Sequence, residues 1–126
     1  MPENKPLTGY PSIDKPWLKY YAEDKRDFTL PVCSVYDYMV RNNQDNLDAT
    51  ALDYFGKEQS YRELIEKIDI CAAAFLSLGV KRGDVVSFCN PTTPEIYYAF
   101  YALNKIGAIA NMIDPRTNKR LVGEYT

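Results

Sequence analysis

The sequence predicts an α/β fold built around two adjacent parallel strands, and three observations support this prediction. Two continuously apolar runs, VVSFC (85–89) and AIANMI (108–113), are typical of strands that are covered on both faces. Between them, 94–106 has apolar residues at helical spacing, and so does 60–78 before them. The unit from 84 to 113 is therefore expected to make a right-handed crossover between parallel strands. One helix is expected to cover each face of the sheet.

The helix expected over 60–78 has signals at both ends. Ser60 and Glu63 match a capping box, in which each residue binds the backbone amide of the other. Gly79 follows the last apolar position, where a left-handed conformation commonly ends a helix. The residues expected on the buried face of this helix are Tyr61, Leu64, Ile65, Ile68, Ala72 and Phe75.

The helix expected over 94–106 begins and ends in a similar way. Thr92 and Thr93 offer caps, and Pro94 is tolerated in a first helical turn. Gly107 is expected to end the helix, and Thr117 to cap a further helix of barely two turns. The apolar face is expected to consist of Ile96, Tyr97, Phe100, Tyr101, Leu103 and Ile106.

The N-terminal part has a different character. Residues 1–33 are expected to form an extended lead-in, because residues 1–31 carry five of the eight prolines. The aromatic run KPWLKYY (15–21) is expected to dock on a larger body. The alternative is an exposed partner site formed by Trp17, Tyr20 and Tyr21.

Residues 34–126 are expected to form part of one domain. SVYDYMVRNN (34–43) predicts a helix that Ser34 caps, with Val35, Tyr38 and Met39 on its apolar face. TALDYF followed by GKEQ predicts a β-hairpin.

Composition excludes several classes of function. The net charge is −2 with both signs interspersed, which gives no electrostatic footprint for nucleic acid or an anionic membrane. No apolar run reaches the roughly 18 residues that a transmembrane helix needs. Cys33, Cys71 and Cys89 lie far apart, which argues against a disulfide framework or a zinc site and predicts a cytoplasmic protein. All three are expected to be buried structural thiols, because their neighbours are apolar.

Motifs of common catalytic sites are missing from the sequence. It contains no histidine, which removes the usual general base and the commonest metal ligand. It has no G-x-G-x-x-G, no G-x-x-x-x-G-K-S/T and no G-x-S-x-G. Asp84 beside Lys81 and Arg82 indicates a solvated turn. Glu63, Glu66 and Asp69 indicate the polar side of a helix. No catalytic, cofactor-binding or metal-binding residue is therefore predicted.

The order of the segments nevertheless resembles the beginning of the adenylate-forming, or AMP-binding, superfamily. SYREL (60–64) resembles its first core motif, commonly L-T/S-Y-x-E-L, and LNKIGAIANMIDP (103–115) resembles its second, commonly L-K-A-G-x-x-x-V-P-I/L-D-P. LGVKRGDVV (78–86) and NPTTPE (90–95) are similar to LGVKKGDRV and PNTPE of the same family. Each motif is weak alone, but their order and spacing over roughly 34–120 are specific.

The sequence departs from the family pattern at a few positions. Gln59 replaces an apolar residue, Asn104 stands where lysine is common, and ANMID has alanine and asparagine where many members have V and P. None of these changes disturbs the expected scaffold.

This superfamily comprises acyl-CoA synthetases, adenylation domains of peptide synthetases and luciferases, all several times longer than 126 residues. The resemblance implies that the chain is an N-terminal fragment of the large domain, truncated before the phosphate-binding loop and inactive alone. The full enzyme would use ATP, magnesium and coenzyme A. In some relatives the segment after the second motif lies near the coenzyme A nucleotide, which by position is around Ile113 and Asp114. A strand end and an Asp-Pro turn is the simpler interpretation, so neither residue is assigned.

Three functional hypotheses follow. The first is a fragment of an acyl-CoA synthetase of the fatty-acid–CoA ligase type, favoured because the chain starts near what looks like a natural N-terminus. The second is a fragment of an amino-acid-activating adenylation domain. The third is a stand-alone scaffold or dimerisation module without enzymatic activity. The expected partners are the rest of the parent enzyme and a second copy of the fragment.

Overall fold

The computed structural model describes residues 6–26 and 29–125. The chain divides into two compact units, residues 1–31 and residues 32–126, and each is described by itself. In the part of the chain that the structure describes, no helix is both long enough and apolar enough to cross a bilayer.

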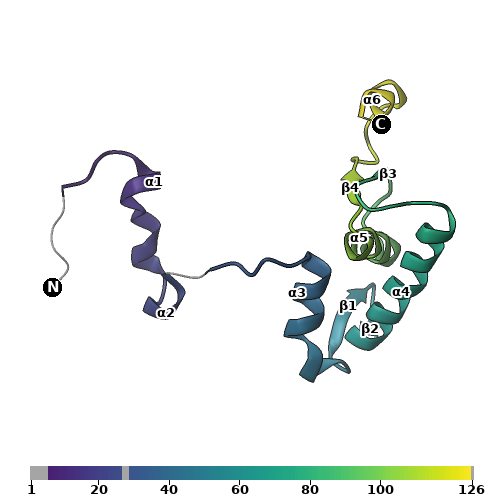
Figure 1. Ribbon diagram of the computed structural model, residues 1–126, viewed down its shortest axis with the longest axis horizontal. Helices are drawn as coiled ribbons and strands as arrows, with labels where there is room; N and C mark the ends of the chain where they lie inside the picture. Colours follow the sequence, from purple (N-terminus) through teal and green to yellow (C-terminus); the bar gives the residue numbers. More distant parts are fainter. Residues whose placement is uncertain (1–5, 27–28, 126) are drawn as a thin grey trace. The chain divides into compact units, whose positions relative to one another are not determined.

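The first unit consists of short helical segments rather than a wholly extended chain (Figure 1). They are α1 (Pro11–Asp14), the 3-10 helix η1 (Pro16–Tyr20) and α2 (Glu23–Arg26). Prolines that were expected to favour an extended chain instead open α1 and η1, where the fixed φ of proline suits a first helical turn. None of the three segments has a buried side chain.

The second unit begins with α3 (Val35–Asn42), followed by the short 3-10 helix η2 (Gln44–Asn46). Ser34 caps α3 as predicted, because its hydroxyl accepts a hydrogen bond from the Asp37 amide at 3.0 Å. The predicted apolar face of α3 is confirmed at Met39, which packs against the core, but is wrong at Val35 and Tyr38. Tyr36 is the buried residue, whereas Val35 is 52% exposed and Tyr38 is 39% exposed.

A β-hairpin follows, as predicted. Strand β1 (Thr50–Tyr54) pairs antiparallel with β2 (Lys57–Ser60). The two turn residues, Phe55 and Gly56, both have positive φ, 52° and 79°, which is the geometry of the two-residue turns that match strand twist. The Asp53 carboxylate accepts a hydrogen bond from the Gly56 amide at 2.9 Å, and this bond closes the turn.

Helix α4 (Tyr61–Ser77) has both predicted end signals. The Ser60 amide donates to the Glu63 carboxylate at 2.8 Å, and the Glu63 amide donates to the Ser60 hydroxyl at 3.2 Å, so the capping box is confirmed. At the other end, Gly79 has φ +88°. The amides of Gly79 and Val80 donate to the carbonyls of Leu76 and Phe75, the pair of bonds that defines a Schellman motif.

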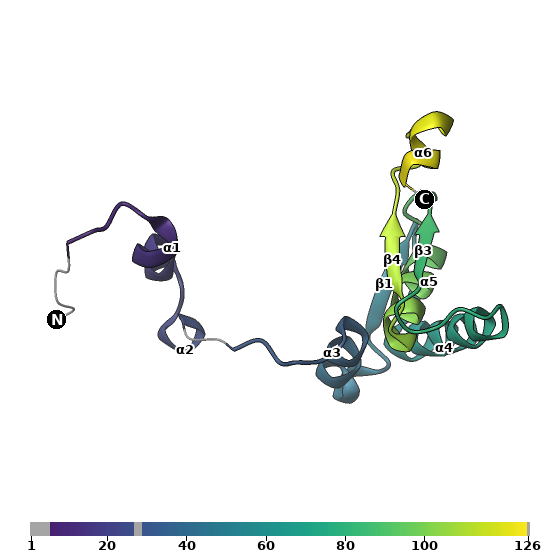
Figure 2. The same cartoon turned by 45° about the horizontal axis from the view of Figure 1, so that its top comes forward.

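Strands β3 (Val85–Phe88) and β4 (Ile109–Met112) are parallel and are joined by α5 (Pro94–Ile106), which confirms the strand–helix–strand unit. Figure 2 shows the two arrows side by side and pointing the same way. Their register runs from Val85 opposite Ile109 to Phe88 opposite Met112. Gly107 ends α5 with φ +79°, as predicted. Helix α6 (Lys119–Tyr125) begins after Asn118 rather than directly after Thr117.

The prediction that one helix covers each face of this sheet is wrong. Helix α4 packs along α5, α5 packs against β4, and the rings of Phe75 in α4 and Phe88 in β3 lie 6.4 Å apart. Side chains alternate between the faces of a strand, so Phe88 and Val85 lie on opposite faces. On the face away from Phe88, Val85 is 62% exposed and Ile109 is 55% exposed. Apolar periodicity shows that a helix has a partner, but it does not show on which side of the sheet that partner lies.

The core lies where α3, α4 and α5 meet. The ring of Tyr36 in α3 belongs to this core, and Ala102 of α5 is completely buried in it. The buried residues of this cluster are Tyr36, Leu64, Ile68, Ala72 and Ala102.

The cysteines are free, but they are not all buried. Cys71 on α4 is half-buried, and burial raises the pKa of its thiol. Cys33 and Cys89 are exposed, which corrects the expectation of three buried thiols. Cys89 follows the last residue of β3, and Cys33 precedes α3, so the apolar neighbours of both are neighbours in sequence only.

Candidate functional site

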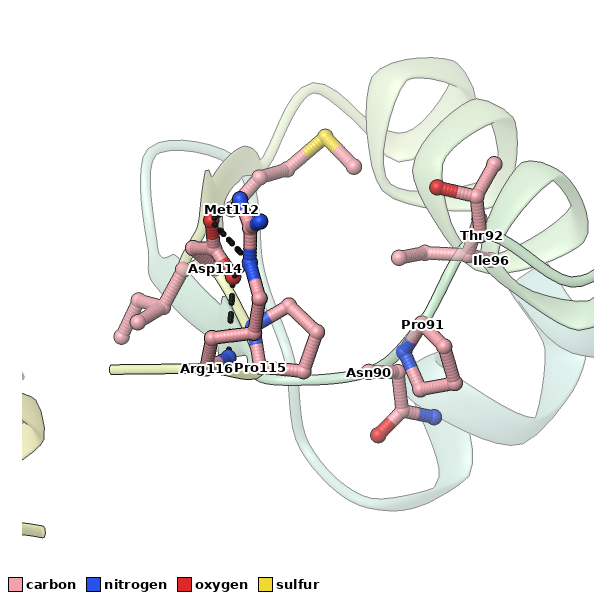
Figure 3. Close-up of a pocket in the computed structure, with 9 residues that line it drawn as sticks. Asn90, Pro91, Thr92, Ile96, Met112, Asp114, Pro115 and Arg116 are labelled. Atoms are coloured by element: carbon pink, nitrogen blue, oxygen red, sulfur yellow. Dashed lines mark hydrogen bonds and ion pairs between the residues drawn. The ribbon is translucent and has the colours of Figure 1, made fainter. Parts of the chain in front are cut away.

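A pocket of about 470 Å³ lies at the carboxyl ends of β3 and β4 (Figure 3). In open α/β sheets, ligands bind in crevices at this edge. The pocket is therefore the first place to look for a site in the described residues. Its lining consists of Asn90, Pro91, Thr92, Ile96, Met112, Ile113, Asp114, Pro115 and Arg116.

Parallel pairing explains why these sequence-distant segments meet. Since β3 and β4 run in the same direction, the turn after Phe88 and the turn after Met112 leave the sheet at one edge. The Ile113 amide donates to the Phe88 carbonyl at 2.7 Å, which extends the pairing into the pocket wall. The two turns that resemble family motifs, 90–95 and 113–115, thus lie next to each other.

The charged part of the pocket is an ion pair between Asp114 and Arg116. Arg116 donates to the two Asp114 oxygens from Nε at 3.0 Å and from Nη2 at 2.6 Å, and its backbone amide donates at 2.9 Å. The side-chain hydrogen bonds from Arg116, with the backbone one, lower the pKa of Asp114 to about 2. Asp114 is therefore ionised at neutral pH and neutralised by Arg116, which makes it a poor general base.

The neighbouring start of α5 offers little to an anion. Thr93 is the N-cap residue of α5, but its side chain makes no capping hydrogen bond, so the predicted side-chain cap is absent. Glu95 lies in the first turn, and the Thr93 hydroxyl lowers the pKa of its carboxyl. An ionised carboxylate already complements the positive end of the helix dipole. A bound phosphate would have to compete with it.

The described residues do not fit magnesium-bound ATP. Within 6–26 and 29–125, no three His, Cys, Asp or Glu side chains are gathered so that they could hold a metal ion. Asp114 is the acidic residue of the pocket, and it is occupied by Arg116. The turn from Asn90 into α5 contains no glycine to let a phosphate approach the backbone.

An aromatic hollow of about 250 Å³ continues along the outer face of α5. The expected core residues Tyr97 and Phe100 line this hollow, and Tyr97 is 38% exposed. Burial raises the pKa of the Tyr101 hydroxyl beside them. Helix α5 therefore presents an apolar second face that the described residues leave open. The lining residues are Thr92, Ile96, Tyr97, Phe100, Tyr101 and Met112.

The other acids noted in the sequence have local structural roles. Asp84 accepts a hydrogen bond from the Lys81 amide at 2.8 Å, which confirms the turn. Glu63 belongs to the capping box, and Asp69 pairs with Lys105 of α5. These carboxylates are not gathered into a site.

One polar cluster joins helices α3, α4 and α5 and has no signal in the sequence. Lys105 donates to the Tyr36 hydroxyl at 3.1 Å and to the Asp69 carboxylate, and its Nζ lies 4.7 Å from the centre of the Tyr36 ring. The Tyr36 amide donates to the Asn104 side chain at 2.8 Å. The hydrogen-bonded partners are 33 to 69 positions apart, so no local pattern could have indicated the cluster.

Comparison with known sequences agrees with the order of these elements. The family model described as AMP-binding enzyme matches residues 39–123. The acetyl-coenzyme A synthetase of Dictyostelium discoideum is 33% identical over 84 residues, and that of Escherichia coli K12 is 38% identical over 79 residues. These matches cover 62% and 58% of this chain, but the chain spans 12% of the length of each relative.

Comparison with solved structures gives the same fold. A fused adenylation–carrier di-domain, NpsA-ThdA, from Klebsiella oxytoca has a TM-score of 0.72 at 29% identity, over 76% of this chain and 18% of that one. The anthranilate CoA ligase AuaEII has a TM-score of 0.70 at 25% identity, over 75% of this chain and 19% of that one. The N-terminal subdomain of NpsA matches with a TM-score of 0.71, over 75% of this chain. The family match, the parallel strand–helix–strand unit and these likenesses together show that the chain belongs to the AMP-binding enzyme family, as the N-terminal part of its large domain.

Proposed function

We propose that this chain is part of an acyl-CoA synthetase, a ligase that activates a carboxylate with ATP and transfers the acyl group to coenzyme A. The observation that carries the proposal is the similarity to acetyl-coenzyme A synthetases, 38–39% identical over 79 residues in several bacteria. A crotonobetaine/carnitine–CoA ligase from Salmonella paratyphi B, 40% identical over 68 residues, supports the same class. Fatty acids as substrates and a cytoplasmic location are part of the proposal.

The proposed reaction has two steps. A carboxylate oxygen attacks the α-phosphorus of ATP, the bond to pyrophosphate breaks, and an acyl-adenylate forms. The thiol of coenzyme A then attacks the acyl carbon, loses its proton, and AMP leaves. Magnesium would supply electrostatic stabilisation of the phosphoryl-transfer charge in the first step. Because the described residues do not fit magnesium-bound ATP, no step is assigned to a residue of this chain.

The proposed role of this chain is to build and hold the scaffold. The buried contacts between α4 and α5 fix the positions of β3 and β4, whose carboxyl ends form the wall of the pocket at Asp114. No catalytic, cofactor-binding or metal-binding residue is proposed here. We expect ATP, magnesium and coenzyme A to bind the rest of the parent enzyme.

A second candidate is an amino-acid- or arylate-activating adenylation domain. The specific observation that favours it is the TM-score of 0.72 with the NpsA adenylation di-domain. This alternative shares the adenylation step but delivers the acyl group to a carrier protein. A stand-alone scaffold or dimerisation module is the third candidate, and the exposed sheet face at Val85 and Ile109 is the feature that would serve it.

Exchange of radiolabelled pyrophosphate into ATP tests the proposal. We expect no carboxylate-dependent exchange by the 126 residues alone, and clear exchange by the longest natural polypeptide that carries them. Coenzyme A should then release AMP and consume the adenylate made from acetate or a fatty acid. The second candidate would be favoured if exchange depended on amino acids and if release of AMP from the adenylate required a carrier protein. Turnover by the repurified 126-residue chain would contradict the proposal that the chemistry lies elsewhere.

A further inference from the structure

The exposed side of helix α4 changes its chemistry halfway along the helix. The first half carries exposed charged side chains, which are those of Arg62, Glu63, Glu66 and Lys67. Residues 70–80, by contrast, contain no charged residue on any side of the chain. A surface helix normally has charged or polar residues on the face away from the core. The second half of α4 is therefore a candidate contact surface.

The exposed residues of this second half lie on one face of the helix. At about 100° per residue, Ile70, Ala74 and Ser77 fall within about 60° of one another, and the fully buried Ile68 is about 160° away from Ile70. Ile70 is 66% exposed, and the C-cap residue Leu78 is 79% exposed. Figures 1 and 2 show α4 at the margin of the second unit. We call this face the α4 patch, and its residues are Ile70, Ala73, Ala74, Ser77 and Leu78.

Charges of opposite sign flank the α4 patch. Glu66 lies one helical turn before Ile70, and Lys81 follows the end of the helix. Both side chains are exposed, and neither has an ion-pair partner among the residues that the structure describes. The patch therefore has an uncharged centre, a free negative charge at one end and a free positive charge at the other.

The neighbouring charges have partners or directions of their own. Glu63 and Lys67 are four residues apart on α4, a spacing at which opposite charges attract each other. The side chain of Arg82 lies against Gly107, because a Cβ built on that glycine would be 3.1 Å from Cγ of Arg82. The two charges that flank the patch are therefore the ones left for a partner.

A face of this kind is complementary to its own copy. In an isologous dimer a two-fold axis relates the two faces, so residue i contacts residue j and j contacts i. If two α4 helices are antiparallel with the axis at Ala74, Ile70 lies opposite Leu78, and Glu66 lies opposite the turn that holds Lys81 of the second copy. A parallel pair would set each Glu66 against another Glu66. Alanine at the crossing point lets the helix axes approach to about 8 Å.

We propose that the α4 patch is a homodimer interface, in which two copies of this chain pack their α4 helices antiparallel around Ala74, with Glu66 of each copy paired with Lys81 of the other. The interface does not depend on the proposed function, because no residue of α4 lines the pocket at Asp114. A standard interface takes about 20–30 residues from each partner. The α4 patch is smaller, so the dimer forms in a concentration-dependent way.

Disulfide cross-linking tests the position of the axis. The starting chain carries Cys33→Ser and Cys89→Ser, because these two thiols are exposed. Adding Ala74→Cys should give a covalent dimer under mild oxidation, because facing Cα atoms at the axis lie within the roughly 4.4–6.8 Å that a disulfide spans. Glu66→Cys in its place should not. Position 66 is eight residues from the axis, so its two copies are about 24 Å apart in an antiparallel pair.

Charge reversal tests the pairing, and its readout is the protein concentration at which the Ala74→Cys chain is half cross-linked. Glu66→Lys and Lys81→Glu should each raise this concentration about ten-fold, because each substitution sets like charges against each other twice in the dimer. The two reversals together should restore it, because they exchange the signs at both ends of the patch. Added salt should reduce the effect of each single reversal.

One control variant separates this interface from association through the open sheet. Ile109→Ser removes an isoleucine that is 55% exposed on the β3–β4 sheet, and it should leave cross-linking through Ala74→Cys unchanged. Three results would overturn the proposal. They are no cross-link through Ala74→Cys at any accessible concentration, equal cross-linking through Glu66→Cys, and a double reversal that cross-links no better than the single ones. The first would mean that another partner or none covers the patch, and the second that the helices pair in parallel.

Discussion

Substitution of Gly79 isolates the cost of a left-handed backbone, because the structure removes the other contributions. Gly79 has φ +88°, and a Cβ built there would meet no atom within 4 Å. The cost of Gly79→Ala is therefore conformational, about 1–2 kcal/mol for a left-handed L-residue. Gly79→Val should cost more, since branching at Cβ restricts this region further, and Gly79→Asn should cost less, since asparagine tolerates it.

Two other glycines provide matched controls. Gly107 has φ +79°, but its Cβ would lie 3.1 Å from Cγ of Arg82. Gly107→Ala should therefore show the same backbone cost plus a further few tenths of a kcal/mol to move the Arg82 side chain. Gly123 lies inside α6 without a positive φ and with open space at its Cβ. Gly123→Ala should have the opposite sign and stabilise that helix by up to about 1 kcal/mol.

Urea denaturation followed by far-UV circular dichroism, at one protein concentration, gives the ranking. We expect midpoints to fall in the order wild type, Gly79→Asn, Gly79→Ala and Gly79→Val. Equal midpoints for Gly79→Asn and Gly79→Val would refute the argument, because they would show that the position does not need a left-handed residue. A loss of stability in Gly123→Ala as large as that in Gly79→Ala would also refute it.

Four further predictions concern Asp114, Lys105, Tyr36 and association. Carboxyl NMR should give a pKa of about 2 for Asp114, and this pKa should rise towards its ordinary value of 3.8 in Arg116→Gln. The stability that the ionised Asp114 carboxylate contributes is therefore present above about pH 4 and is lost as the pH falls towards 2. Desolvation lowers the pKa of Lys105, but the hydrogen bonds to Asp69 and Tyr36 outweigh desolvation and raise the pKa. The stability that the charged Lys105 contributes is therefore present below about pH 10.5 and is lost at higher pH. Tyr36→Phe should cost about 0.5–1.5 kcal/mol in urea denaturation, whereas Tyr36→Ala should cost about 3–5 kcal/mol because it also empties the core. Light scattering after size exclusion should show self-association of the isolated chain through its open strand edges and exposed apolar face, and a sharp 14.5 kDa monomer peak that binds no hydrophobic dye would contradict this.

The limits of prediction are clearest at α3. Its start at Ser34 followed from a local hydrogen bond between residues three apart, so the sequence alone indicated it. The burial of Tyr36 did not follow, because Tyr36 is held by Asn104, Asp69 and Lys105 from two other helices. In a helix of eight residues, a few tertiary contacts outweigh a weak apolar pattern.

The pocket also combines features that the sequence indicated with one that it did not indicate. Asp114 and Pro115 were recognised as a turn after a strand, and NPTTPE (90–95) as a segment similar to one of the family. That these two turns face each other is a consequence of parallel pairing between β3 and β4, which was predicted. The bidentate contact from Arg116 was not predicted. It depends on the direction in which the chain leaves β4.

The helices and strands from residue 34 onwards, their order and the family resemblance could be predicted from the amino-acid sequence, because caps, glycine stops and apolar periodicity act between residues a few positions apart. The short helices α1, η1 and α2 could not. Ser60 with Glu63, and Gly79 with its two terminal hydrogen bonds, are where those local rules placed them. Contacts between distant segments instead place α4 along α5 and leave Val85 and Ile109 exposed on one face of the β3–β4 sheet. Burial is favourable for any apolar residue but does not specify its partner, so the choice among partners is made by contacts between distant parts of the chain.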